Sequence, residues 1–291
     1  MISFKSNISS RSHTDTGLAY GTGFIALIVM VVLTLLLLFL AKESWPALRS
    51  GGWMRFFRSD AWFPLSGELN VLPMLWATLM TSIGALLLAI PFGVVSAIFV
   101  RFYAPSYLRE LVRQILALLA GIPSVVYGLW GLSVLVPLIA QWEPPGASLL
   151  AGILVLAIMI LPTIALTTHS ALNAIPTSHL LAAAGLGLTR KRTILSVALP
   201  SARRGIVTGV LLAAARAIGE TMALLMVEGN VVQTPTSLFD PVRVLTTNIA
   251  LEMAYATGDH RAALFASGLL LMSMVSLLAW TAAKGERRRY A

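Results

Sequence analysis

The sequence contains no cysteine, which excludes a disulfide framework, a thiolate nucleophile and any metal site built on cysteine. Charged residues are scarce, at 11% of the 291 residues, whereas a soluble domain carries about 25%. None of the lysines follows a glycine, so the chain lacks a Gly-Lys-Ser/Thr phosphate loop for ATP. The histidines are scattered, and we expect neither a metal cluster nor a catalytic pair from His13, His169, His179 and His260.

Hydrophobic residues, in contrast, make up 57% of the chain, and the mean hydropathy is +0.84. A soluble domain of this length has no way to bury so much apolar surface, so the composition predicts an integral membrane protein in contact with lipid. The net charge of +9 fits the concentration of lysine and arginine in cytoplasmic loops. No basic stripe alternates with exposed aromatic residues, and we therefore predict no nucleic-acid partner.

Six apolar runs predict an all-α, polytopic protein with six transmembrane helices. They cover residues 18–41, 71–100, 111–140, 149–168, 206–227 and 262–283. Proline and glycine interrupt several runs, most clearly at Gly121-Ile122-Pro123, and indicate bent helices around a pathway. The chain divides into 1–70 (tail, first helix and outer loop), a core of 71–283 with a cytoplasmic loop at about 176–204, and a basic tail of 284–291.

Fourteen lysines and arginines fall in the two tails and in the loops after the second and fourth runs, and six fall in the opposite loops. This bias predicts that both termini are cytoplasmic. The first outer loop mixes aromatic residues with Arg55 and Arg58, which predicts a segment on the membrane surface or, alternatively, a partner-binding surface. In the last outer loop, residues 242–256 predict a short helix. Glu228, just before that loop, is either a gate residue or a boundary charge.

The cytoplasmic loop predicts a helical hairpin. Ser178 is expected to cap its first helix after Pro176. Gly185 and Gly187 are expected to end that helix, since glycine tolerates the left-handed conformation of a C-cap. A second, apolar and basic helix is expected to stop before Pro200.

The spacing in this loop resembles a motif of the membrane subunits of bacterial ABC importers: Glu-Ala-Ala, three residues, Gly, nine residues, then Ile-x-Leu-Pro. The matching positions are Leu181, Ala182, Ala183, Gly187, Val197, Leu199 and Pro200. Leu181 stands where the family usually has glutamate, which removes one charged contact. In that family the hairpin docks into a cleft of a separate ATPase subunit. The resemblance therefore implies that ATP is hydrolysed on a partner and that this chain is not an enzyme.

The fifth run contains two charges, Arg216 and Glu220. An arginine at the centre of a membrane helix costs about 2.5–3.5 kcal/mol, and such charges mark pathways or coupling sites. Four residues apart, the two side chains are expected to share a helix face and to pair. A row of small residues predicts close helix contact, and a second subunit packed against it would place both charges at the contact edge: Gly205, Gly209, Ala213 and Ala217.

Residues 216–223, Arg-Ala-Ile-Gly-Glu-Thr-Met-Ala, resemble a stretch of the phosphate-specific transport permeases of the PstC type. Residues 122–131, Ile-Pro-Ser-Val-Val-Tyr-Gly-Leu-Trp-Gly, resemble a second stretch of the same permeases. The resemblance implies a type I importer (MetI-like) fold, with a five-helix core and one peripheral helix, in the bacterial inner membrane. It implies a role in moving phosphate for Arg216 and Glu220. It also implies partners: a PstA-type permease, two PstB-type ATPase subunits and a PstS-type periplasmic phosphate-binding protein.

The planar fork of arginine suits phosphate oxygens, and our hypothesis is that Glu220 competes with phosphate for Arg216 and keeps the site weak. Ser124, Tyr127 and Thr221 are further candidates, whose hydroxyls would line the pathway or simply pack. No cofactor is predicted. The alternatives are a permease for sulfate, molybdate or phosphonate, and an ion-coupled secondary transporter, which would show internal symmetry. A membrane-embedded enzyme would need convergent histidine, aspartate or serine side chains.

Overall fold

The structure is a computed structural model that describes residues 13–49, 56–57 and 61–287. The predicted residues that lie outside it include Lys5, Arg11, Arg55, Arg58 and the last four residues of the basic tail. Helices and connecting loops make up the described chain, and its two strands form one small antiparallel hairpin, in which Trp62 of β1 (Trp62–Phe63) pairs with Leu69 of β2 (Glu68–Leu69). The all-α, polytopic prediction is confirmed.

The helices, in chain order, are α1 (His13–Arg49), α3 (Leu72–Ile98), α4 (Ser106–Gly121), α5 (Ser124–Trp130), α6 (Val136–Ala140), α7 (Leu149–Asn173), α8 (Thr177–Gly185), α9 (Arg190–Thr193), α10 (Leu199–Ile218), α11 (Met222–Val227), α12 (Leu245–Glu252) and α13 (Gly258–Arg287). Short π-helical segments, η2 (Phe99–Tyr103), η3 (Gly131–Leu135) and η4 (Ile194–Ala198), continue three of them, and η1 (Pro64–Ser66) is a 3-10 turn. Five helical runs are long and apolar enough to cross a membrane, or six if the bent α4–α6 segment counts as one.

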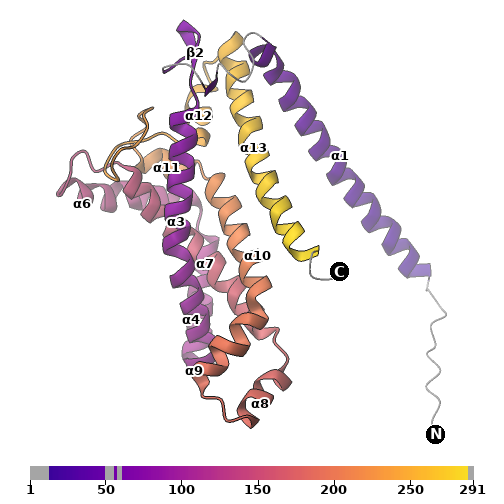
Figure 1. Cartoon of the computed structure of the whole chain (residues 1–291). Coiled ribbons are helices and arrows are strands. Elements are labelled where there is room, and N and C mark those ends of the chain that lie inside the picture. The colour runs from indigo at the N-terminus through magenta and orange to yellow at the C-terminus, as the bar shows by residue number, and fades with distance from the viewer. Residues whose placement is uncertain (1–12, 50–55, 58–60, 288–291) are drawn as a thin grey trace.

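Two long helices, α1 and α13, lie side by side at one edge of the molecule (Figure 1). The rings of Phe39 and Phe265 meet edge to face between them, with centroids 5.6 Å apart. The most apolar window of α1 has a mean hydropathy of 3.3 and is 0% buried within the chain. An apolar helix surface that no protein covers is suited to lipid, so α1 is the peripheral helix.

The core is formed by α3, α7 and α10, with α7 the most enclosed of the spans. The row of small residues on α10 packs against α7 of the same chain: a Cβ added at Gly209 would overlap the Thr167 side chain, and one at Gly205 would overlap Ala171. Ala213 and Ala217 of the same row are buried. The prediction of a close helix contact at this row is confirmed. The expectation that a second subunit packs against the row is wrong, because α7 of the same chain already covers this face of α10.

Two predicted spans have different limits in the structure. The interruption predicted at Gly121-Ile122-Pro123 is a bend of 94° between α4 and the α5–α6 segment. The predicted fifth run, 206–227, is not one helix: α10 ends at Ile218 and α11 begins at Met222. In the other direction, α10 is continuous with η4 and α9, so this span begins at Arg190.

Candidate functional site

The first of two helix breaks separates α4 from α5. Ile122 is extended, as expected for a residue before proline, and Pro123 is the N-cap of α5. A helix that ends here leaves backbone carbonyls without intrahelical partners. The Leu119 carbonyl accepts a hydrogen bond of 3.3 Å from the Ile122 N–H and a second one, of 2.8 Å, from the Tyr127 hydroxyl. The break is thus stabilised by a side chain in the first turn of the next helix.

The second break, between α10 and α11, comprises Gly219, Glu220 and Thr221. The Glu220 N–H donates to the Ala217 carbonyl at 3.3 Å, which tightens the last turn of α10. The Thr221 hydroxyl donates to the Gly219 carbonyl at 3.4 Å. The Glu220 carbonyl accepts a hydrogen bond of 2.6 Å from the hydroxyl of Thr246, which belongs to α12. Irregular backbone among apolar helices needs such partners, and its presence marks the segments that line cavities.

The two breaks are brought near each other, because the helices that follow them, α5 and α11, pack together. A Cβ added at Gly128 would lie 2.9 Å from both the Ala223 Cα and the Met226 Sδ. One added at Gly131 would lie 2.8 Å from a side-chain carbon of Val227. The two sequence stretches that carry the resemblance, 122–131 and 216–223, are therefore in contact, and each contains a helix break.

The predicted ion pair between Arg216 and Glu220 is absent from the described part of the chain, and this expectation is wrong. The two residues do not share a helix face, because α10 ends at Ile218, between them. The Glu220 carboxylate turns instead to the start of α11, where it accepts a hydrogen bond of 3.2 Å from the Ala223 N–H. Arg216 is partly exposed in the last turn of α10, within electrostatic range of the Tyr127 side chain.

The remaining predicted pathway residues also lie at the breaks. Ser124 is the first residue of α5, one turn before Tyr127, and is partly exposed. Thr221 is the N-cap residue of α11 and is also partly exposed. All five candidates, Arg216, Glu220, Thr221, Ser124 and Tyr127, thus gather around the two facing breaks.

Glu228, for which the sequence left two roles open, is fully buried within the protein. One carboxylate oxygen accepts a hydrogen bond of 2.8 Å from the Thr81 hydroxyl of α3. The carboxylate fits only because Gly152 of α7 has no side chain, since a Cβ there would overlap it. Its other oxygen has no hydrogen-bond partner among the described residues. The feature of the sequence that pointed to Glu228 was its position as a lone glutamate at the end of an apolar run.

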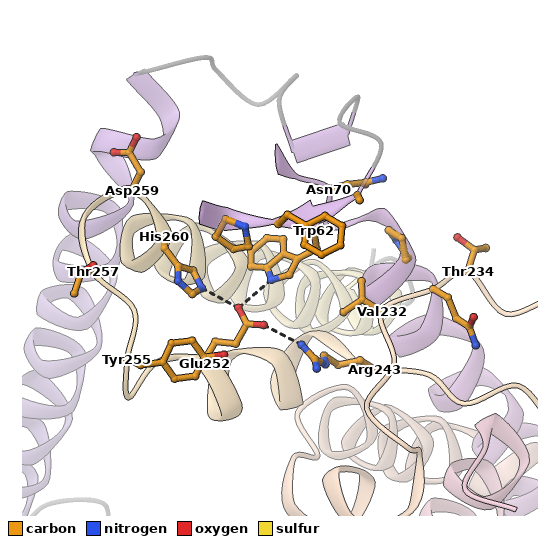
Figure 2. Close-up of a pocket in the computed structure, with 15 residues that line it drawn as sticks. Trp62, Asn70, Val232, Thr234, Arg243, Glu252, Tyr255, Thr257, Asp259 and His260 are labelled. Atoms are coloured by element: carbon orange, nitrogen blue, oxygen red, sulfur yellow. Dashed lines mark hydrogen bonds and ion pairs between the residues drawn. The ribbon is translucent and has the colours of Figure 1, made fainter. Parts of the chain in front are cut away.

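A polar cluster, here called the outer cluster, consists of Trp62, Arg243, Glu252 and His260 and borders a cavity of about 870 Å³ (Figure 2). Sequence reasoning missed it, although α12 confirms the short helix predicted within 242–256. Trp62 and Phe56 of the first outer loop are buried against this region. These two side chains pack on the protein, whereas Phe63 of the same loop is 63% exposed, and the membrane-surface segment stays a prediction.

The predicted hairpin at the opposite end of the molecule is present, with changed limits (Figure 1). The N-cap of α8 is Pro176, not Ser178, which lies inside the helix. The helix ends at Gly185, and Gly187 has φ +74°, the left-handed value that favours glycine. The second helix does not stop before Pro200 but runs into α10. In the π-helical segment η4, the Leu199 N–H donates a hydrogen bond to the Ile194 carbonyl. Pro200 follows in the first turn of α10, where its lack of a backbone N–H is tolerated.

Apolar side chains project from this hairpin. Leu181 is 71% exposed and Leu186 is 81% exposed, whereas Ala183 is buried against the base. Nothing lies within 4 Å of a Cβ added at Gly185 or Gly187, so this end of the hairpin is open. Ala182 is exposed, Val197 and Leu199 are partly buried, and Pro200 is exposed. Exposed leucines at the tip of a loop are typical of a protein–protein contact.

Several apolar spans, two facing helix breaks and an exposed hairpin define a multi-pass membrane protein of the transporter class. The chain belongs to the family of binding-protein-dependent transport system inner membrane components, whose model matches residues 89–288. It is accordingly a multi-pass component of the inner membrane and a non-catalytic transport subunit.

Individual relatives agree with this family. The chain is 36% identical over 275 residues to the phosphate transport system permease protein PstC of Mesorhizobium japonicum, covering 87% of this chain and 84% of that protein. It is 34% identical to the PstC protein of Haemophilus influenzae, covering 88% of each. It is 40% identical over 227 residues to a probable ABC transporter permease of Bacillus subtilis, covering 76% of this chain and 74% of that protein.

Solved structures share the fold. A chain of a bacterial alginate ABC transporter in complex with a periplasmic protein matches with a TM-score of 0.66 at 16% identity, covering 96% of this chain and 98% of that chain. The MetNI methionine ABC transporter in an inward-facing conformation matches with a TM-score of 0.61 at 19% identity, covering 75% of this chain and 95% of that chain. The predicted type I importer permease fold is confirmed.

Proposed function

We propose that this chain is a permease subunit of an ATP-driven, binding-protein-dependent phosphate importer and forms half of its path across the inner membrane. The PstC relatives support phosphate as the substrate. The observation that carries the proposal is Arg216: it lies at the facing helix breaks, is partly exposed, and has no ion-pair partner among the described residues. A cation without a carboxylate in an apolar region is costly and marks a functional site.

The electrostatics favour an anion. Because Glu220 bonds to the start of α11, its carboxylate does not occupy the guanidinium of Arg216. The five N–H donors of that guanidinium match the oxygens of a tetrahedral oxyanion. Ser124, Tyr127 and Thr221, which belong to the same two breaks, are the further residues proposed to line the path. Competition between Glu220 and phosphate for Arg216, our hypothesis from the sequence, would require the carboxylate to leave the Ala223 N–H.

The assembly we propose follows from the same features. A second permease of the PstA type completes the pathway on the side of the breaks. Two PstB-type ATPase subunits hydrolyse ATP, and the exposed leucines of the α8–α9 hairpin support docking of one of them to this chain. A PstS-type phosphate-binding protein docks at the opposite, periplasmic end.

Both termini are proposed to be cytoplasmic. The bias of lysines and arginines supports this orientation. The C-terminal end of α13 and the N-terminal end of α1 point toward the hairpin end of the molecule, away from α12 and β2 (Figure 1), which also supports it.

The test is uptake of labelled phosphate, at low concentration, by cells that lack this chain and are complemented with wild type or Arg216→Gln. We expect loss of uptake to the background level with Arg216→Gln and partial uptake with Arg216→Lys, which keeps the charge but not the planar fork. Arg203→Gln, an exposed arginine of α10 away from the breaks, is the matched control for loss of one positive charge.

Sulfate and molybdate uptake, measured in the same cells, test the runner-up substrates. A defect in one of these with normal phosphate uptake would keep the importer and overturn phosphate as its substrate. Normal phosphate uptake by Arg216→Gln would overturn the role of this residue.

A further inference from the structure

The short helix α12 contacts both the outer cluster and the break between α10 and α11. A second connection runs from Arg243 through Asn230, but it reaches α11 at the Leu225 carbonyl rather than the break. Its C-terminal residue, Glu252, belongs to the outer cluster, and its second residue, Thr246, reaches the break between α10 and α11. The two residues are six positions apart, or about 9 Å along a helix axis. A hydrogen-bonded helix of this length is stiff, so its ends move together.

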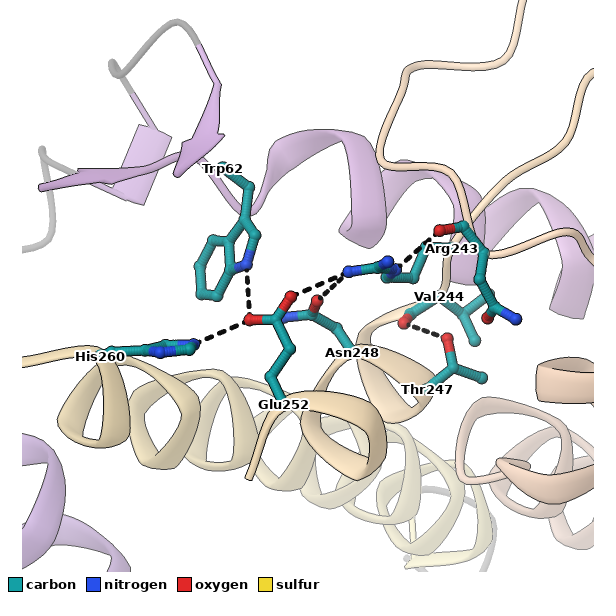
Figure 3. A network of polar contacts seen from close by, with 8 residues as sticks. Trp62, Arg243, Val244, Thr247, Asn248, Glu252 and His260 are labelled. Atoms are coloured by element: carbon teal, nitrogen blue, oxygen red, sulfur yellow. Dashed lines mark hydrogen bonds and ion pairs between the residues drawn. The ribbon is translucent and has the colours of Figure 1, made fainter. Parts of the chain in front are cut away.

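At the outer end, one carboxylate receives hydrogen bonds from three other segments (Figure 3). Glu252 Oε2 accepts from Trp62 Nε1 at 2.9 Å and lies 2.8 Å from His260 Nε2. Glu252 Oε1 lies 2.9 Å from Arg243 Nη1, which also donates to Asn248 Oδ1 at 3.1 Å. Glu252 is only 7% exposed. The carboxylate therefore joins the first outer loop, the segment before α12 and the start of α13 to α12.

At the inner end, α12 joins two other elements. The Leu245 N–H donates to the Thr78 hydroxyl of α3 at 3.0 Å. The Thr246 hydroxyl donates to the Glu220 carbonyl at 2.6 Å, across a separation of 26 residues. Among the described residues, the other hydrogen bonds of the break come from its own neighbourhood, between residues 215 and 225. Thr246 thus connects the break to a distant part of the chain.

We propose that Thr246 is a positioning residue: its hydroxyl holds the backbone at Glu220, and α12 carries displacements of the outer cluster to the segment that presents Arg216 and Glu220. The outer cluster borders the cavity of about 870 Å³, at the end of the molecule opposite the α8–α9 hairpin (Figure 1). The inference rests on the proposed function and deepens it, because it links events at the outer face to the anion site without any contact between Thr246 and the substrate.

The neighbouring threonine provides a matched control. The Thr247 hydroxyl donates to the Val244 carbonyl, three residues before it, and Thr247 is fully buried. A Thr→Val change at either position removes one hydroxyl and keeps the shape of the side chain. Only the change at Thr246 removes the hydrogen bond to the break.

The experiment uses the complete transporter in liposomes, with both permeases, the ATPase subunits and the binding protein, and measures inorganic phosphate moved per ATP hydrolysed. For Thr246→Val we expect this ratio to fall about fivefold, the effect of one lost hydrogen bond. Thr246→Ser, which restores the hydroxyl, and Thr247→Val should stay within about twofold of wild type. A wild-type ratio for Thr246→Val, or an equal fall for Thr247→Val, would overturn the inference.

A second measurement does not depend on transport. The chain has no cysteine, so Met222→Cys, at a 45% exposed position at the start of α11, can be labelled alone with a maleimide. We expect Glu252→Gln to change the labelling rate at least threefold when Thr246 is present and to leave it unchanged in a Thr246→Ala background. An equal change in both backgrounds would overturn the connection through Thr246.

Arg216→Gln in the same liposomes separates this inference from the proposed function. Normal phosphate transport by that variant would overturn the proposed pathway. Its loss of transport, together with a wild-type ratio for Thr246→Val, would overturn only the role of Thr246.

Discussion

The two helix breaks are formed and stabilised by different kinds of residues. The break between α4 and α5 is made by Pro123 and stabilised by Tyr127, four residues later, so its determinants lie within one short stretch. The break between α10 and α11 follows Gly219 and is held by Thr246, from another helix. The first break is therefore locally encoded, whereas the geometry of the second depends on the packing of α12. A change at the outer face has a physical route to the second break through Thr246. Among the described residues, no hydrogen bond from α12 reaches the first break.

The largest expected effect comes from forcing the two breaks apart. Gly128→Val would place side-chain atoms against the Ala223 backbone, which has no room to yield. Overpacking of this kind costs about 1–3 kcal/mol, and separation of α5 from α11 would also displace Tyr127 and Glu220. We expect phosphate uptake to fall at least about tenfold, measured in complemented cells with the amount of membrane-inserted protein determined in parallel.

Gly121→Val is the matched control for this substitution. Nothing lies within 4 Å of a Cβ at Gly121, so the same change there should have a much smaller effect. Equal defects in the two variants would show that the contact between the breaks is not what matters.

An intermediate effect is expected for Tyr127→Phe, which disturbs only the first break. The change leaves the Leu119 carbonyl with only the 3.3 Å hydrogen bond from the Ile122 N–H, and one lost hydrogen bond costs about 0.5–1.5 kcal/mol. We expect the maximal rate of phosphate uptake to fall by roughly threefold to tenfold, read from the concentration dependence of uptake. Tyr107→Phe, at a position that is 75% exposed, should behave as wild type; a similar loss there would contradict the assigned role of the Tyr127 hydroxyl.

The smallest effect is expected for Gly219→Ala in the second break. Gly219 has φ −88° and ψ −2°, values open to alanine, and its added Cβ would lie 3.5 Å from the Ala215 carbonyl oxygen, an ordinary contact. We expect uptake within about twofold of wild type, since Gly→Ala at an allowed conformation is tolerated. If uptake instead fell tenfold, the backbone at Gly219 would have to approach the substrate closely, and Thr246 would not be the main determinant of this break.

Much of the fold was predictable because hydropathy is a local property. The apolar runs located the spans, and the proline at 123 located the first break. The left-handed glycine at 187 was predictable for the same reason, since the backbone conformation of a C-cap depends on the residue itself. The candidate pathway residues were found as a set, and the structure gathers them at the breaks, where their roles are proposals for the experiments above.

The partners of these side chains were not predictable. The spacing of Arg216 and Glu220 predicted an ion pair on the assumption of a continuous helix, which the end of α10 at Ile218 removes. The small residues of α10 were correctly read as a contact surface, but no local pattern says that α7, rather than a second subunit, fills it.

By itself the sequence determined a polytopic, all-helical chain with a bend at Pro123. It also determined a hairpin suited to contact with a partner protein and two charges near the end of the fifth span. These features follow from the free energy of transfer into the membrane and from backbone conformation, and both are determined by short stretches of local sequence. Only the tertiary structure decided that the two breaks face each other, that Glu228 is enclosed beside Thr81 and Gly152, and that Thr246 holds Glu220. Hydrogen bonds and close packing act over a few ångströms, so their partners are set by which helices the fold brings together.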